Sequence, residues 1–202
     1  MAGVTRNPRP LFVTALPTAP SDGMEVYYQS TIAGTGGGAT DTMATTGAVW
    51  HLRYRAAGGT YKWEFVGGAG LDVTLTTAAT AITATSPTSL STNPTLKLPL
   101  AGDYQIEIFS NGASISSAIG AAYLSLDYSG GMTEAAAVTG GSFLYGETTS
   151  NNGGIYATRL KTITGAATVL TMKAWVTAAV TFYPNAASTF AYGIRATPIR
   201  VG

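Results

Sequence analysis

The sequence has 202 residues, of which 10% are charged and 25 are glycine, and its formal net charge is +1. This length suits one β-sandwich with a small appendage and excludes two large domains, while the near-zero charge gives no attraction to nucleic acid or to a membrane surface. So few charges protect a surface poorly against association, and we therefore expect a protein that is assembled with neighbours.

Residues 1–22 predict an extended N-terminal arm. Prolines at positions 8, 10, 17 and 20 interrupt the apolar runs, so the segment has neither a strand periodicity nor the apolar stretch of a secretion signal. The arm ends at the sequence Pro-Ser-Asp-Gly, which is a strong turn signal. Arms of this kind often dock on a neighbouring protein, and Arg6 and Arg9 are the candidate contact residues.

Residues 23–68 predict a small aromatic β-hairpin subdomain. A short strand at 24–29 precedes a glycine-rich loop that lacks the Gly-Lys-Ser/Thr of a phosphate-binding loop. Two alternating runs, 49–55 and 61–66, are joined by a Gly-containing loop and predict a hairpin. One face carries Trp50, Leu52, Tyr54, Tyr61, Trp63 and Phe65, and the other carries His51, Arg53, Arg55, Lys62 and Glu64. We expect the aromatic face to be buried; the alternative is an exposed platform that stacks sugar rings.

Residues 69–202 predict a jelly-roll-like antiparallel β-sandwich, so the expected fold class is all-β. The stretch at 95–109 organises this part, because two runs of alternating apolar residues pivot there on a Pro-Leu-Ala-Gly-Asp corner. Further strands are expected at 72–77, 122–128, 155–163, 169–183 and 190–199. The run at 169–183 has one wholly apolar face and carries Trp175 and Tyr183 on the other face. These two aromatic residues are candidate oligomer contacts.

The sequence gives no basis for catalysis. The single histidine, His51, is predicted on a surface strand among arginines rather than in a Ser-His-Asp triad. The ten carboxylates are scattered singly, without the close pair of a glycosidase or the spacing of a calcium loop. Cysteine is absent, which removes disulfides, thiolate catalysis and cysteine-based zinc sites. We therefore expect a protein that is not an enzyme and that needs no cofactor or metal.

Several stretches resemble a known family. They are LPTAPSDGMEVYY at 16–28, VWHLRYR at 49–55, YKWEFVGG at 61–68, LAGDY at 100–104 and ATPIRVG at 196–202. These residues are similar to a module of minor structural and tail-associated virion proteins of tailed bacteriophages, especially those of actinobacterial hosts. More distantly, the Gly-Asp-Tyr corner resembles the start of a strand in trimeric jelly rolls of the complement-globular-head and tumour-necrosis-factor kind, a likeness of fold only.

The resemblance implies a virion protein that is assembled in the cytoplasm of the bacterial host. Its function would be that of a tail or tail-fibre component whose loops, such as the polar segment 140–154, contact the host surface, with a host glycan as a candidate ligand. One alternative is a capsid decoration or head-fibre protein that stabilises the head, and another, of a different class, is a carbohydrate-binding module. The arm would bind other virion proteins. Sparse charge, outward aromatic residues and the arm together lead us to expect a homo-oligomer, most simply a trimer.

Overall fold

The structure is a computed structural model in which the described residues form β-strands and connections. The described residues are 10–31, 48–75, 81–91, 93–115, 122–129, 143–146, 153–176, 182–184 and 192–202. None of them lies in a helix that is long and apolar enough to cross a membrane. The strands are β1 (Leu11–Val13), β2 (Glu25–Gln29), β3 (Val49–Tyr54), β4 (Trp63–Gly68), β5 (Leu71–Leu75), β6 (Thr88–Ser89), β7 (Thr95–Lys97), β8 (Gly102–Ile115), β9 (Ala122–Ser129), β10 (Phe143–Gly146), β11 (Gly153–Ile163), β12 (Val169–Val176), β13 (Phe182–Pro184) and β14 (Tyr192–Val201).

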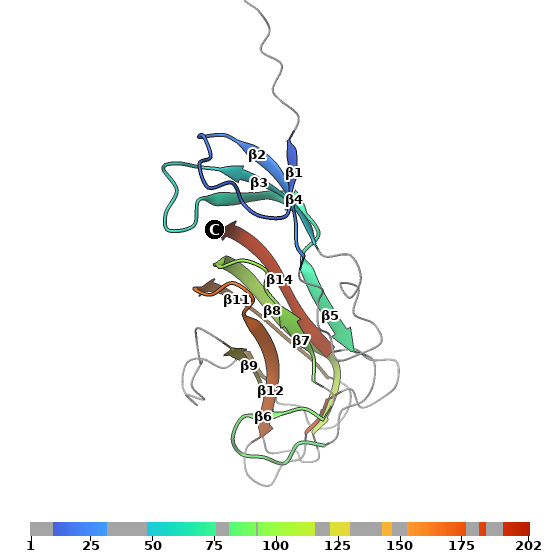
Figure 1. Ribbon diagram of the computed structural model, residues 1–202. Coiled ribbons are helices and arrows are strands. Elements are labelled where there is room, and N and C mark those ends of the chain that lie inside the picture. Colours follow the sequence, from blue (N-terminus) through green and yellow to red (C-terminus); the bar gives the residue numbers. More distant parts are fainter. Residues whose placement is uncertain are drawn as a thin grey trace, which may run out of the picture.

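Strands β1 to β4 form the N-terminal part of the molecule, drawn at the top of Figure 1. The predicted hairpin is present as β3 and β4, and β2 pairs with β3 so that Val26 lies opposite Leu52 and Tyr28 opposite Trp50. All four of these side chains are buried. They belong to one face because side chains alternate along a strand, and the core of this part is therefore built from that face.

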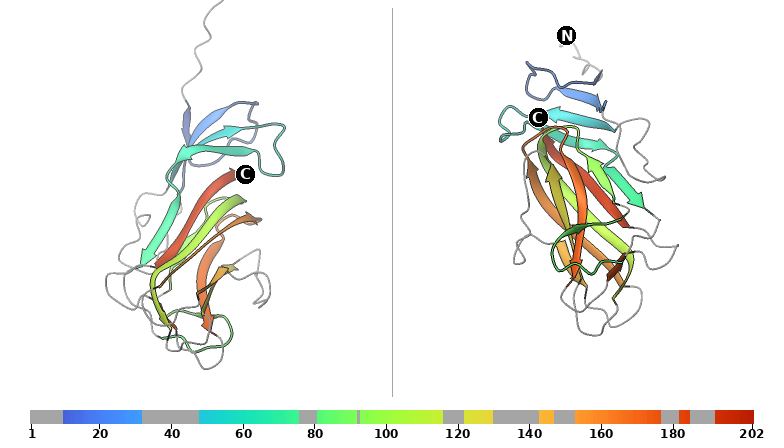
Figure 2. Two further views of the ribbon diagram at one scale, coloured as in Figure 1. Left: turned by 180° about the vertical axis from the view of Figure 1, so that it is seen from behind. Right: turned by 60° about the horizontal axis from the view of Figure 1, so that its bottom comes forward.

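The remaining strands form a two-layered sandwich, which the right-hand view of Figure 2 shows from below. One layer has the order β5-β14-β8-β11 and the other has β10-β9-β12, with β6 and β7 both on β12. All of these pairs are antiparallel. Along the chain the strands alternate between the layers except from β6 to β7, from β9 to β10 and at the short β13, which is the connectivity of a jelly roll. The predicted all-β, jelly-roll-like sandwich is thus confirmed.

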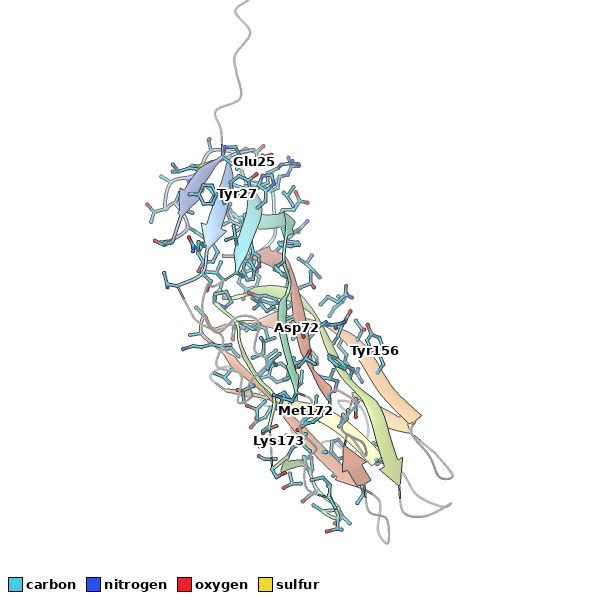
Figure 3. The ribbon with its side chains drawn as sticks, turned by 90° about the vertical axis from the view of Figure 1, so that its right-hand side faces the viewer. Glu25, Tyr27, Asp72, Tyr156, Met172 and Lys173 are labelled. Atoms are coloured by element: carbon cyan, nitrogen blue, oxygen red, sulfur yellow. The ribbon has the colours of Figure 1, made fainter. Side chains whose placement is uncertain are left out.

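The sandwich core lies between the two layers and is filled by the side chains of every second residue along the strands. Strand β8 contributes Tyr104, Ile106 and Ile108, and strand β12 of the other layer contributes Leu170 and Met172, all fully buried. In Figure 3 the side chain of Met172 lies between the layers while its neighbour Lys173 points outward. The apolar alternation that the sequence shows in these two strands therefore marks the interior.

The two parts share one sheet. Strand β14 pairs with β5 and β8 along the sandwich, and its last residues, Arg200 and Val201, pair with Glu64 and Trp63 of β4. The nine-stranded sheet thus runs from β1 to β11 without a break in its hydrogen-bonded order. The chain changes direction between β4 and β5 at Gly68, whose φ of 120° lies in the region that favours glycine.

Tyr104 joins the sandwich core to the N-terminal core. Its hydroxyl donates a hydrogen bond of 2.8 Å to the carbonyl of Leu100, in the corner that precedes β8. Its ring lies 6.4 Å from the ring of Trp50, at an interplanar angle of 60°. Burial raises the pKa of Tyr104, so the phenol stays protonated and can keep donating to the corner.

The prediction of one continuous strand over 169–183 is wrong in its second half. Strand β12 ends at Val176 in the five-stranded sheet, whereas β13 pairs with β8 in the nine-stranded sheet. A period of two indicates which side chains face the interior, but it carries no information on which sheet a strand joins.

The predicted arm is extended at residues 11–13, but it is not free of the core there. Strand β1 pairs in parallel with β2, and Val13 and Leu16 pack against buried residues. The sequence analysis missed this strand because it has only three residues and lies in a segment with prolines at positions 8, 10, 17 and 20.

Candidate functional site

The candidate site is the face of the nine-stranded sheet that points away from the core, which we call the outer face. The pairing registers align one row of polar residues across six adjacent strands: Glu25, Arg53, Glu64, Arg200, Asp103 and Thr162. We call this the charge row. Acidic and basic residues alternate along it, and it crosses from the N-terminal part onto the sandwich. A row of opposite charges on neighbouring strands favours this register over its alternatives.

Glu25 is the most strongly engaged member of the charge row. Its Oε1 accepts a hydrogen bond of 2.8 Å from Nε of Arg53, and its Oε2 lies 3.0 Å from Nε2 of His51. The bonds from Arg53 and His51 hold the pKa of the Glu25 carboxyl below its usual value. Farther along, Glu64 pairs with Arg55 at 3.2 Å, and the hydroxyl of Thr162 donates to Asp103 at 2.7 Å. The carboxylates of the row are therefore compensated by local partners.

A stack of three rings lies beside the charge row on the outer face. The ring of Phe12 lies 5.0 Å from that of Tyr27 at an interplanar angle of 25°, and the ring of Tyr27 lies 5.0 Å from that of His51 at 31°. We call these residues the ring stack. Phe12 is 68% exposed, so one end of the stack meets solvent. Figure 3 shows Tyr27 and Glu25 together at the N-terminal end of the molecule.

His51 is held in place by two neighbours. Among the described residues its imidazole has Glu25 as its hydrogen-bond partner and Tyr27 as its ring partner. A Ser-His-Asp system would need a hydroxyl on the ring nitrogen opposite the carboxylate, and the described contacts of His51 include none. The described residues also contain no group of three His, Cys, Asp or Glu side chains that could hold a metal ion. The arrangement is thus suited to binding through a fixed ring.

A surface hollow of about 310 Å³ lies at the sandwich end of the charge row. It is lined by Asp103, Leu160, Lys161, Thr162, Ile199 and Arg200. Leu160 is 71% exposed there, on β11, the last strand of the nine-stranded sheet. Burial lowers the pKa of Lys161, which lies next to it. The hollow thus combines an exposed aliphatic side chain with two basic residues.

The predicted contact residues are not brought together among the described residues. Trp175 lies on the outward side of β12, but it is only 4% exposed and stacks on Tyr123 with ring centroids 5.0 Å apart. Tyr183 lies in β13, opposite Ser114, and therefore in the other sheet. Arg6 and Arg9 lie outside the described residues. A contact with a partner at these positions stays a prediction.

The expectation that Trp50 and Trp63 belong to the core is confirmed. Trp50 is fully buried and Trp63 is 4% exposed. The indole Nε1 of Trp50 donates a hydrogen bond of 3.0 Å to the carbonyl of Ala69, which satisfies its polar atom. These two rings cannot form an exposed platform for sugars.

The sequence analysis missed the ring stack. The alternation in 25–29 carries a usable signal, because it places Tyr27 on the face opposite Val26 and Tyr28. Phe12 joins the stack through a parallel strand pair, and no local pattern predicts that pairing. Comparison with protein-family models and with curated proteins finds no match for this chain.

Proposed function

We propose that this chain is a structural protein of a tailed-phage virion, in the tail or tail fibre, that is anchored through its N-terminal arm and contacts the host surface. The proposal combines the resemblance of the hairpin and corner residues to virion proteins with the jelly-roll sandwich. The observation that carries it is the difference between the two ends of the molecule.

The N-terminal part, β1 to β4, and the end of β14 lie at the same end of the molecule. The chain enters β1 there, and β14 ends there beside β4. Figure 1 shows the C-terminal residue close to β4 at this end. An anchor that continues from β1 would therefore emerge at this end of the molecule.

Several sandwich strands begin or end at the opposite end of the molecule, away from β1 to β4. The register places Tyr192 of β14 beside Leu75 of β5 and Ser110 of β8, so β5 ends and β14 begins at this end. Strand β12 ends and β9 begins here as well, since Val176 pairs with Ala122. A protein that is held at one end would present these strand ends at the other, which suits a host contact.

The decisive experiment is to locate the protein on the particle. Gold-labelled antibody against the purified chain should mark the tail or its fibres in electron micrographs. Label on the head would favour the capsid decoration or head-fibre alternative instead. Purified particles that contain no copy of the chain by mass spectrometry and carry no label would contradict the whole proposal.

A further inference from the structure

The ring stack ends at a position that lacks a side chain. The registers place Phe12 of β1 beside Tyr27 of β2, Tyr27 beside His51 of β3, and His51 beside Gly67 of β4. Three of these four neighbouring positions carry a ring, and the fourth carries only a hydrogen atom. Rings therefore lie side by side on β1, β2 and β3, and the neighbouring position on β4 has no side chain.

The space above Gly67 is open. Apart from Gly67 itself and its two chain neighbours, no described residue has an atom within 4 Å of the position that a Cβ would take there. The backbone does not call for glycine either, because the positive φ values of the described glycines belong to Gly23 and Gly68. At Gly68, by contrast, a Cβ would clash with the carbonyl oxygen of Val49. The ring of His51 thus has no side chain opposite it on β4, and we call this unfilled position between His51 and Gly67 the notch. Neither a positive φ nor a close approach requires glycine there.

The wall of the notch is held in place before any ligand arrives. Glu25 bonds to Nε2 of His51 at 3.0 Å, and the ring of Tyr27 lies 5.0 Å from the other side of the imidazole. The His51 side chain is 23% exposed, so part of it remains accessible. A ring that is already oriented loses little freedom on binding, and this favours its use as a stacking surface.

The surroundings of the notch define the chemistry of its ligand. Val49 lies two residues before His51 on the same strand face and is 37% exposed, which gives one side of the notch an apolar border. Arg53 and Glu64 lie on the other side, in the charge row. The ligand should therefore be a ring with a flat apolar face and a polar rim. Aromatic faces and a few fixed polar groups are the usual composition of small-molecule sites.

The charges around the notch favour a neutral ligand. Glu25 is compensated by Arg53 and His51, and Glu64 is compensated by Arg55. A charged ligand would have to break one of these pairs, because each nearby carboxylate already has a cationic partner. A neutral pyranose meets these requirements: its C–H face packs on the ring, and its hydroxyls can bond to Arg53 and Glu64 without displacing the pairs.

We propose that the notch between His51 and Gly67 binds one pyranose ring of a neutral glycan. The inference rests on the proposed host-surface contact for its biological setting, and it names the class of ligand. It differs from the carbohydrate platform considered for Trp50 and Trp63, since those rings are buried on the opposite face of the same strands.

The single histidine makes the site directly observable by nuclear magnetic resonance. The purified chain is titrated with methyl β-glucopyranoside and, separately, with methyl β-galactopyranoside. The imidazole C–H resonances should move and saturate with at least one glycoside, and the sugar protons on the packed face should shift upfield through the ring current. Shifts of both the imidazole resonances and the sugar protons would identify stacking on His51 itself.

Gly67→Val is the variant that fills the notch. The side chain enters open space at an ordinary φ, so the melting temperature should stay that of the parent, while glycoside binding should weaken by about tenfold or more. Gly59→Val is the matched control, because Gly59 lies in the hairpin loop and its Cβ position is also open beyond its own two chain neighbours. Binding by this control should equal that of the parent.

His51→Gln removes the ring and keeps a polar group that can bond to Glu25. Saturation transfer to the glycoside should then be lost. The inference is overturned if neither glycoside moves the imidazole resonances, or if Gly67→Val binds as well as Gly59→Val. It is also overturned if the resonances move with protein concentration alone, since a second copy would then occupy the notch. If the chain binds a glycoside but is absent from the particle, the proposed function is contradicted and the inference about the notch is not.

Discussion

Glu25 connects the two features of the outer face, because one of its carboxylate oxygens bonds to the charge row and the other to the ring stack. Arg53 orients the first oxygen, and His51 lies against the second. The side chain is 31% exposed, so solvent screens both interactions and each contributes little to folding stability. Its main effect is therefore to fix the orientation of the His51 ring.

The lowered pKa of Glu25 predicts a small pH-dependent contribution to stability. The contribution is complete above the ordinary value of 4.5 and is lost as the pH falls through the lower pKa of the folded state. Glu25→Gln should therefore lower the free energy of unfolding near pH 7 by less than about 1 kcal/mol, and the difference from the parent should vanish near pH 2. Urea unfolding at several pH values measures this.

Glu107→Gln serves as the control for that measurement. Glu107 also lies on an outer strand face, and its described contact is a hydrogen bond of 3.3 Å from the side chain of Gln105. The control should unfold like the parent at each pH. A constant difference between parent and Glu25→Gln from pH 7 to pH 2 would contradict the assigned role of Arg53 and His51.

At the scale of the element, strands β3 and β4 have two faces with different tasks. One face buries Trp50, Leu52 and Trp63 in the core, and the other carries His51 and the notch beside Gly67. The fold depends on the first face, whereas the second is available for binding. Substitutions on the two faces should therefore differ strongly in their cost.

Trp63→Ala should lower the free energy of unfolding by about 3 to 5 kcal/mol, because it empties a packed core position. Phe12→Ala should lower it by less than about 1.5 kcal/mol, mostly through the lost ring contact with Tyr27. Urea unfolding of both variants at one protein concentration, followed by far-ultraviolet circular dichroism, compares them. A larger loss for Phe12→Ala than for Trp63→Ala would show that the two faces have been assigned the wrong way round.

The strands with a clear period could be predicted from the sequence because each depends on local alternation. This holds for β3 and β4 of the hairpin, for β8 after the Gly-Asp corner and for the first half of the run 169–183. Strands β1 and β6 are only three and two residues long, which is too short for a period to be recognised. Their place in the fold is decided by pairing with distant strands.

The candidate site was hidden from the sequence for the same reason. The charge row and the ring stack bring together residues from six and three strands, and each row exists only once the registers are set. The sequence analysis placed His51, Arg53 and Glu64 on a solvent face of the hairpin, which the structure confirms. It could not place Arg200 or Asp103 beside them, because no local rule links strands that are about a hundred residues apart.

At the scale of the whole molecule, self-association is expected on the side of β11. This strand ends the order of the nine-stranded sheet, and it exposes Tyr156 and Leu160. Figure 3 shows Tyr156 at the border of the sandwich. A long strand at the end of a sheet that carries exposed apolar side chains tends to pair or to be covered. A covering second and third copy would fit the predicted trimer.

Light scattering on the purified chain should therefore give the mass of three copies. Leu160→Glu should reduce this to the mass of one copy, because an unpaired charge would be buried in the contact. Val66→Glu is the control, since Val66 is also exposed but lies in the N-terminal part. A monomeric mass of the parent chain at micromolar concentration would contradict the trimer.

The sharing of β14 between the two parts has a consequence for how the protein is made. This strand lies between β8 on one side and β4 and β5 on the other, yet it follows all of them in the chain and is synthesised after them. Until residues 192–201 are synthesised, β5 and β8 lack the neighbour that joins them, and the N-terminal sheet has no strand on which to dock. The nascent chain therefore exposes apolar faces and open strand edges until β14 is made, which is the condition that favours aggregation and chaperone binding. A chain that stops within residues 192–201 would lack part of the strand that joins β4, β5 and β8, and it should therefore be less stable than a chain that contains all of β14.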